Sequence, residues 1–173
     1  MLNQDAAHIV GPLGYIVVEF NYLEEKLGHL ISALVGKGDD AALAFSLPSF
    51  SAKIEIADKV GGLCILEENR RTTLRRLLVE AKRVNRLRNQ FIHGQYLMGV
   101  DLLNPDEGRV LLFASIRVDA NESSLIDEGR IENRKSFYKI TSEELLDAAK
   151  AIAQCAGEIL AFIDDVAGLP SAS

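Results

Sequence analysis

The chain has 173 residues, of which 48% are hydrophobic and 25% are charged, which is the composition of an ordinary globular domain. Its length suffices for one domain with a substantial core, and no apolar run reaches the roughly 20 residues that a membrane-spanning helix needs. The net charge of −6 argues against a general polycation. No signal-peptide pattern opens the chain, and Cys64 and Cys155 form no CxxC pair, so we expect two free thiols in a reducing cytoplasm.

Apolar periodicity predicts three helices in the first half of the chain, because leucine, isoleucine and phenylalanine recur at alternating spacings of three and four. Pro12 suits the first turn of the first helix, which "GKGDD" ends. Ser49 or Ser51 is the expected N-cap of the second helix, and Gly61-Gly62 is its expected end. These helices are predicted over about 12–35, 49–63 and 69–93.

A change of pattern after the third helix predicts a β insertion over about 95–140. "QYLMGVDLL", "RVLLFASIRVD" and "SFYKI" are rich in β-formers, and "NPDEG" between the first two has turn chemistry. The polar segment 120–135 is long for a structureless loop, and the sequence leaves its role open. Thr141 and Glu144 then match a capping box, which opens a last helix over about 142–166. The sequence therefore predicts a mainly α antiparallel bundle of four to five helices, with a small antiparallel β-meander before the last helix.

Positive charge is concentrated in the third helix. Between Arg70 and His93 the chain has eight basic residues and one acid, Glu80, while the rest of the chain is strongly acidic. This stripe fits a localised anion site, but it also fits a solvated helix face that is balanced by acids on neighbouring helices. Charge alone does not choose between the two interpretations.

The segment "RLRNQFIHGQY" places a polar cluster at the end of that helix. At about 100° per residue, Arg88 falls inside the apolar arc, where an arginine needs a partner. Lys82, Asn89 and His93 lie on the adjoining flank. Arg88 and His93 point about 140° apart on a regular helix, so one helix is not expected to direct both side chains at one small group. Two copies of the chain, packed along this edge, can do so.

Each of these residues also has a purely structural interpretation. A histidine in the last turn of a helix is favoured by the helix dipole and can bind free carbonyl groups, which accounts for His93. Arg88 can form a structural ion pair with an acid on another helix, such as Glu24 or Glu25. The spacing of the residues leaves both alternatives open.

"RNQFIHG" resembles the signature of the HEPN superfamily, in which an arginine and a polar residue precede a histidine by a gap of four to six residues. Arg88, Asn89 and His93 match it with a gap of four. "FNYLEEKLGHLI" resembles the long first helix of such proteins and "SFSAKIEIADKV" the short second one, whereas the β insertion is less typical. The resemblance implies a single HEPN-like domain over 1–173.

Many HEPN proteins are metal-independent endoribonucleases that act as dimers, with two motifs in one composite cleft. The resemblance implies that His93 is a general acid or base for attack of a ribose 2′-OH on the adjacent phosphodiester, and a histidine titrates near neutral pH, which suits that role. Arg88 would hold the scissile phosphate and stabilise its developing charge. Asn89 would orient His93 or bind the phosphate. No cofactor and no metal site are expected.

The same resemblance extends to substrate and partners. Lys82, Arg83 and Arg86 would bind flanking phosphates, and Tyr96 would stack on a base, unless it occupies a position in the sheet core. The implied partners are a second copy of the chain, RNA and, for a toxin, a nucleotidyltransferase-like antitoxin, with no membrane. The alternative from another class is a non-catalytic helical dimer that binds RNA, a nucleotide or a protein.

Overall fold

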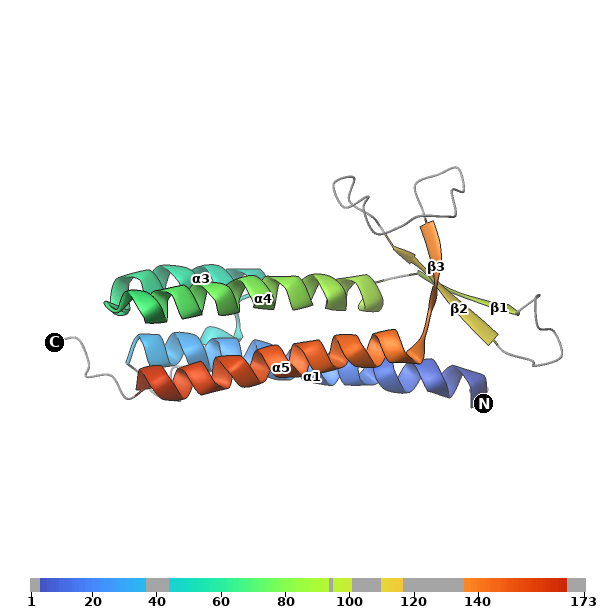
Figure 1. Cartoon of the computed structure of the whole chain (residues 1–173), viewed down its shortest axis with the longest axis horizontal. Coiled ribbons are helices and arrows are strands. Elements are labelled where there is room, and N and C mark those ends of the chain that lie inside the picture. The colour runs from blue at the N-terminus through green and yellow to red at the C-terminus, as the bar shows by residue number, and fades with distance from the viewer. Residues whose placement is uncertain (1–3, 37–43, 94, 101–109, 117–135, 168–173) are drawn as a thin grey trace. The chain divides into compact units, whose positions relative to one another are not determined.

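The computed structural model describes the backbone of residues 4–36, 44–93, 95–100, 110–116 and 136–167, and the side chains of 9–36, 44–93 and 141–167. The protein is mainly helical, as predicted (Figure 1). None of its described helices has an apolar stretch long enough to cross a bilayer. The helices are α1 (Gln4–Leu34), η1 (Ala44–Ser46, a short 3-10 helix), α3 (Phe50–Cys64), α4 (Glu68–Ile92) and α5 (Ser142–Ala167).

The chain forms two compact units, which are described separately. The bundle unit comprises Val18–Arg86 and Ala149–Ser173, and the sheet unit comprises Met1–Val17 and Leu87–Ala148. Helices α1, α4 and α5 each contribute residues to both units.

The helices of the bundle unit do not all alternate in direction. Phe20 stacks on Phe50 with ring centroids 4.9 Å apart, and Glu24 pairs with Lys53 at 3.2 Å, so α1 and α3 run in the same direction (Figure 1). Helix α4 runs antiparallel to α3 and to α5. The expected antiparallel bundle is therefore wrong for the α1–α3 pair, because α3 begins beside Phe20, in the middle of α1, and not beside the end of α1.

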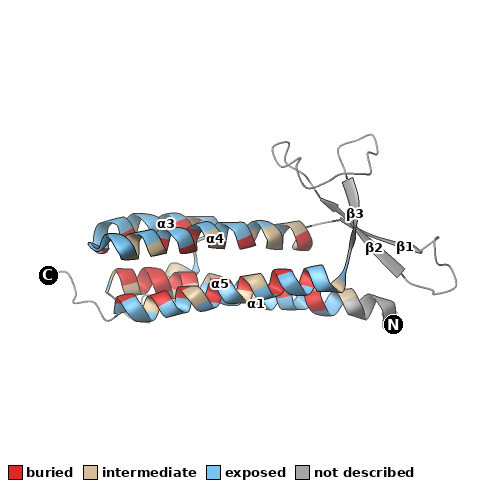
Figure 2. Cartoon of the chain, in the orientation of Figure 1, coloured by how far each residue is buried: buried red, intermediate tan, exposed pale blue. Residues whose placement is uncertain are grey.

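The core of the bundle unit is built from the apolar stripes that the periodicity identified. Figure 2 shows buried and exposed positions alternating along each helix, as an amphipathic helix requires. Removing these side chains from water supplies the main favourable term in folding. Core residues that are at most 2% exposed include Leu23, Leu27, Leu30, Ile31, Ile54, Leu74, Leu77, Val84, Ile152 and Ile159.

Gly61 has a packing role rather than the terminating role that the sequence predicted. Helix α3 continues through Gly61 and Gly62 and ends at Cys64, with Ile65 as its C-cap. A Cβ atom at Gly61 would lie 2.1 Å from Cδ2 of Leu74, whereas a Cβ at Gly62 would meet nothing within 4 Å. Gly61 is therefore the residue that lets α3 and α4 approach closely. The predicted N-cap is confirmed at Ser49, whose Oγ accepts from Ala52 N at 3.4 Å.

Helix α1 begins earlier than predicted. It starts at Gln4, so Pro12 lies inside the helix and not in its first turn. Proline removes only one backbone donor, and the helix continues on both sides of it. The predicted end is confirmed: Gly36 adopts φ 67°, the left-handed conformation that favours glycine, and donates to Ala33 O at 3.1 Å.

The sheet unit contains three strands within the segment where the sequence predicted a β insertion. Strands β1 (Gln95–Val100), β2 (Val110–Ile116) and β3 (Ser136–Ile140) form an antiparallel sheet in the order β1-β2-β3. Thr141 and Glu144 form the predicted capping box of α5, with Thr141 N donating to Glu144 Oε2 at 2.7 Å and Glu144 N to Thr141 Oγ1 at 3.2 Å. Gly94 and the 120–135 segment lie outside the described residues.

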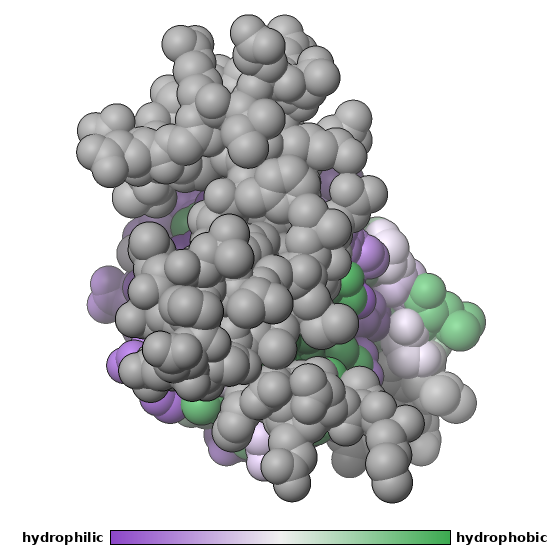
Figure 3. Space-filling model, turned by 90° about the vertical axis from the view of Figure 1, so that its right-hand side faces the viewer, coloured by the Kyte–Doolittle hydropathy of each residue, from purple (hydrophilic) through white to green (hydrophobic). Residues whose placement is uncertain are grey.

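The described surface mixes polar and apolar residues. Where Figure 3 shows described residues, hydrophilic and hydrophobic ones lie next to one another. Several large apolar residues are exposed, among them Val18 at 61% and Val79 at 66%. Single exposed apolar residues are normal on a folded protein.

Candidate functional site

The predicted polar cluster lies where α4 ends. The helix stops at Ile92, and the backbone N–H of His93 donates to Asn89 O at 3.0 Å, so His93 directly follows the last helical residue. Phe91 is buried, Arg88 is half-buried, and Asn89 and His93 are exposed. The amphipathic pattern thus anchors this segment by Phe91 and leaves the polar residues accessible.

Arg88 joins the other two members of the cluster. Its Nη1 donates to Asn89 Oδ1 at 3.0 Å and lies 3.0 Å from His93 Nε2. Nη1 carries two hydrogens, so both contacts can exist at once. The Nε atom of Arg88 is shielded from solvent, which restricts the guanidinium at its base.

This contact corrects the expectation that one helix cannot bring Arg88 and His93 together. The argument from helix angles assumes that each side chain is short and points straight out from a regular helix. An arginine side chain is long enough to cross the face, and His93 lies beyond the last helical residue. One chain therefore assembles the arginine and the histidine by itself, and the geometric reason for a second copy is lost.

The chemistry of the Arg88–His93 contact defines the state of the imidazole. A guanidinium has only donors, so Nε2 of His93 must be the acceptor, and its neutral ring then carries the proton on Nδ1. A proton on Nε2 would leave the guanidinium without an acceptor on the ring and break this hydrogen bond. Asn89 contacts Arg88 through its side chain and His93 through its backbone carbonyl, so it positions the arginine.

The two acids considered as partners of Arg88 have other neighbours. Glu24 pairs with Lys53, whose side chain is only 3% exposed, and this pair holds α1 to α3. Glu25 pairs with Lys26 at 2.9 Å and lies 3.6 Å from His29. Both acids are therefore engaged in contacts on the first half of the chain.

Much of the basic stripe is balanced by acids, as the more ordinary interpretation expects. Arg70 pairs with Asp165 at 2.9 Å and Arg76 with Glu158 at 2.8 Å, both across to α5. Arg83, predicted to bind substrate, forms a bidentate ion pair with Glu80, in which Arg83 Nη2 lies 2.6 Å from Glu80 Oε1.

The other predicted binding residues are placed differently. Lys82 and Arg86 are exposed, and neither makes an ion pair with any described residue. Tyr96 lies in β1 opposite Ala114, but its side chain is outside the described part of the structure. The structure therefore keeps Lys82 and Arg86 available and commits Arg83 to Glu80.

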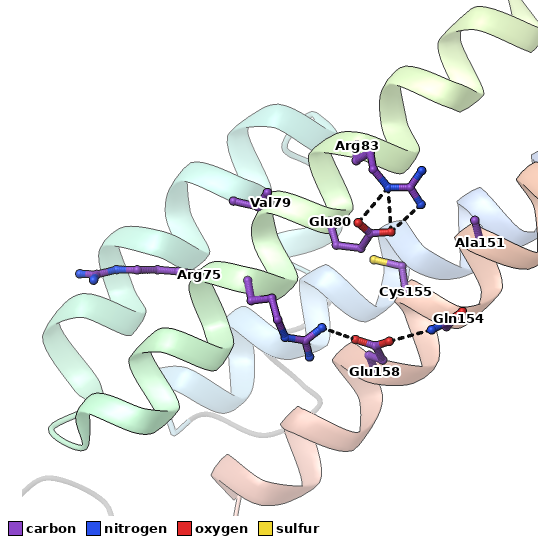
Figure 4. Close-up of a pocket in the computed structure, with 9 residues that line it drawn as sticks. Arg75, Val79, Glu80, Arg83, Ala151, Gln154, Cys155 and Glu158 are labelled. Atoms are coloured by element: carbon purple, nitrogen blue, oxygen red, sulfur yellow. Dashed lines mark hydrogen bonds and ion pairs between the residues drawn. The ribbon is translucent and has the colours of Figure 1, made fainter.

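The sequence missed a pocket between α4 and α5 in the bundle unit (Figure 4). It contains the Arg76–Glu158 and Arg83–Glu80 ion pairs. Its lining residues are Arg75, Arg76, Val79, Glu80 and Arg83 of α4 and Ala151, Gln154, Cys155 and Glu158 of α5. The i,i+3 spacing of Glu80 and Arg83 was readable from the sequence. The contribution of α5 was not readable, because it depends on how two helices pack.

Ion pairs lower the pKa values of the pocket carboxyls, and burial raises the pKa of its thiol. The hydrogen bond from Arg83 lowers the pKa of Glu80, and that from Arg76 lowers the pKa of Glu158. Burial raises the pKa of the Cys155 thiol to about 12, and the two neighbouring carboxylates add to the rise. Because the thiolate is the reactive form, Cys155 is a packing residue and not a nucleophile.

Comparisons with known proteins add no relative. No family model matches the chain, and neither the curated proteins nor the solved structures contain a match. Among the described residues, no group of three histidine, cysteine or acidic side chains could hold a metal ion.

Proposed function

We propose that the chain is a metal-independent endoribonuclease of the HEPN superfamily, a helical bundle with an inserted antiparallel sheet that acts in the cytoplasm as a homodimer. The observation that supports this most is the 3.0 Å contact between Arg88 Nη1 and His93 Nε2, with Asn89 on the same guanidinium. A cation and a proton-transfer group within contact distance are the parts that phosphodiester cleavage by a 2′-OH requires.

Each residue has a defined role in this reaction. A phosphate that binds to Arg88 competes with His93 for the guanidinium. When the guanidinium turns from His93 to the phosphate, the lone pair of Nε2 becomes free. His93 then takes the proton of the ribose 2′-OH as the oxygen attacks phosphorus. The bond from phosphorus to the 5′ oxygen breaks, and that oxygen receives a proton from an imidazolium. The products are a 2′,3′-cyclic phosphate and a 5′-hydroxyl.

The dimer in this proposal rests on the resemblance and not on the geometry of one chain. A second copy would place its own Arg88 and His93 at the same phosphate, so that the arginine of one chain can act with the histidine of the other. Subunit mixing tests this arrangement. Cleavage restored by mixing His93→Ala with Arg88→Ala chains supports a shared site, whereas no rescue indicates that each chain uses its own Arg88–His93 pair.

The activity is tested with single-stranded RNA and purified protein in EDTA. We expect wild-type cleavage, and loss of it in His93→Ala and Arg88→Ala. Removing a general acid or base typically costs about 100- to 10,000-fold in rate. The matched control is His29→Ala, because His29 is a half-buried histidine on α1 beside Glu25. This variant should cleave as the wild type does.

The outcome that contradicts the proposal is equal cleavage by wild type, His93→Ala and Arg88→Ala, which indicates a contaminating nuclease. A substrate with a single 2′-deoxy nucleotide at the cleaved position provides an independent check. The proposed attack needs the 2′-OH, so cleavage at that position must stop. Continued cleavage there would rule out the mechanism.

One observation also favours the non-catalytic alternative, a helical dimer that binds RNA, a nucleotide or a protein. The Nε2 atom of His93 is already engaged by Arg88, as in a purely structural hydrogen bond. Stable RNA binding without cleavage would select this alternative. A toxin with a nucleotidyltransferase-like antitoxin shares the catalytic proposal, and growth arrest that depends on His93 tests it.

A further inference from the structure

One face of α4 carries three cations in a row. Arg75, Val79, Lys82 and Arg86 are spaced by four, three and four residues, which places them within an arc of about 60° on the helix. All four are exposed, Val79 by 66%. We call this set the outer face of α4; it lies entirely within the bundle unit. Arg75 and Val79 also line the edge of the pocket, whereas Lys82 and Arg86 do not.

The charge of the outer face is not neutralised by the described protein. Arg75, Lys82 and Arg86 make no ion pair with any residue that the structure describes, although their sequence neighbours Arg76 and Arg83 do. From Arg70 to His93 the one acid is Glu80, and it is bound to Arg83. Within the described residues, a chain of net charge −6 therefore keeps a positive face.

We propose that the outer face binds the phosphate backbone of single-stranded RNA, with Arg75, Lys82 and Arg86 as its contacts. The choice of RNA rests on the proposed function. Arg75 and Arg86 are eleven residues apart, about 16 Å along the helix axis. One phosphate cannot meet both, but an extended polyanion can. This binding set includes Arg75, which the sequence analysis did not select, and excludes Arg83.

The composition of the face favours a nucleic-acid backbone over the other polyanionic surfaces. A helix that lies on a membrane needs a broad apolar side, and Val79 is the single apolar member of the outer face. Guanidinium groups bind phosphate oxygens in pairs, and the ammonium of Lys82 adds a point charge. Such contacts carry no base information, so binding should be independent of sequence and sensitive to salt.

The test compares two triple variants that remove the same number of charges from the same helix. Both are made with His93→Ala, so that the RNA stays intact. Arg75→Gln, Lys82→Gln and Arg86→Gln remove the outer face. Arg70→Gln, Arg76→Gln and Arg83→Gln remove arginines that are engaged in ion pairs. Binding of end-labelled oligouridine is followed by fluorescence anisotropy over a salt series, after circular dichroism has confirmed that each protein is folded.

Each lost phosphate contact lowers the salt slope by about 0.7 for a single strand, so the outer-face variant should lose about 2. Between roughly 50 and 200 mM salt, the affinity of the protein with an intact outer face should therefore fall about 20-fold more than that of the outer-face variant. The ion-pair variant should keep the original slope. Equal slopes in the two triple variants would show an effect of net charge and overturn the proposal.

Two further outcomes separate this inference from the nuclease proposal. If the wild type cleaves RNA and the outer-face variant keeps the original salt slope, the inference about the outer face is overturned and the nuclease proposal is unaffected. If the wild type never cleaves RNA but the outer-face variant loses salt slope, the inference is supported and the nuclease proposal is refuted. Equally tight binding of an acidic peptide of the same charge would assign the face to a protein partner and overturn the choice of RNA.

Discussion

Two faces of α4 have the same kind of residue and different chemistry. On the pocket face, Arg76 and Arg83 pair with Glu158 and Glu80 (Figure 4). On the outer face, Arg75 and Arg86 have no acid partner among the described residues. Arg75 and Arg76 are adjacent in sequence, so the difference comes from the α5 carboxylate that only one of them reaches. Identical side chains thus become structural or available according to what packs beside them.

The largest expected effect concerns the reactivity of Cys155, the buried thiol on the pocket face. At pH 8 a thiol of pKa about 12 is ionised in about one molecule in ten thousand, so Cys155 should react far more slowly than a free thiol. Cys64 is exposed and is the matched control. A thiol-reactive dye should label one cysteine per native chain and two in denaturant. Fast labelling of native Cys64→Ser would show that the pocket is open to reagents.

The core side of α4 should be the most sensitive to added volume. Gly61→Ala places a methyl group against Leu74, which is 2% exposed, and should destabilise the protein by about 1–3 kcal/mol. Gly62→Ala meets open space in the same helix and should be neutral or stabilising by up to about 1 kcal/mol. Urea unfolding measures both. Equal free energies of unfolding for the two variants would refute the close approach of α3 and α4 at Gly61.

A smaller effect compares the two charged faces directly. Arg76→Gln removes an ion pair to α5 and should lower the free energy of unfolding by no more than about 1 kcal/mol, because the pair is at the surface. Arg75→Gln should change it by less than about 0.5 kcal/mol. Thermal unfolding of both proteins measures the difference. A larger loss in Arg75→Gln would mean that the outer face has a structural partner.

The smallest expected effect is the response of the pocket face to acid. Arg83 and Arg76 hold the pKa values of Glu80 and Glu158 below the ordinary 4.5, so the stability from these pairs is complete above about pH 4.5. It is lost as the pH falls through the lower, folded-state values. Urea unfolding of wild type and of an Arg76→Gln, Arg83→Gln variant measures this, and the variant should lose stability less steeply in acid. Parallel curves would contradict the assigned cause.

The features that could be predicted from the sequence are local ones. Ser49, Gly36 and the Thr141–Glu144 capping box involve residues within four positions of one another, so their contacts follow from sequence spacing. Gly61 was misread as a helix end because its reason lies in Leu74, thirteen residues away on another helix. The direction of α3 was also missed, because periodicity gives a helix its buried side and not its orientation.

The candidate site divides in the same way. The sequence selected Arg88, Asn89 and His93 and placed all three at the end of the third helix. It did not predict that Arg88 and His93 of one chain contact each other. The angles of a regular helix take no account of the length of an arginine side chain or of the end of the helix before His93.

The sequence by itself determined which residues form helices, which sides of them are buried, and where positive charge collects. Those properties depend on side-chain polarity and on a period of 3.6 residues, both of which are readable along one chain. Only the tertiary structure decided that acids of α5 neutralise Arg70 and Arg76, why Gly61 is a glycine, and why Cys155 is inert. Each of these depends on a neighbour that is distant in sequence, and electrostatic and steric interactions act through space and not along the chain.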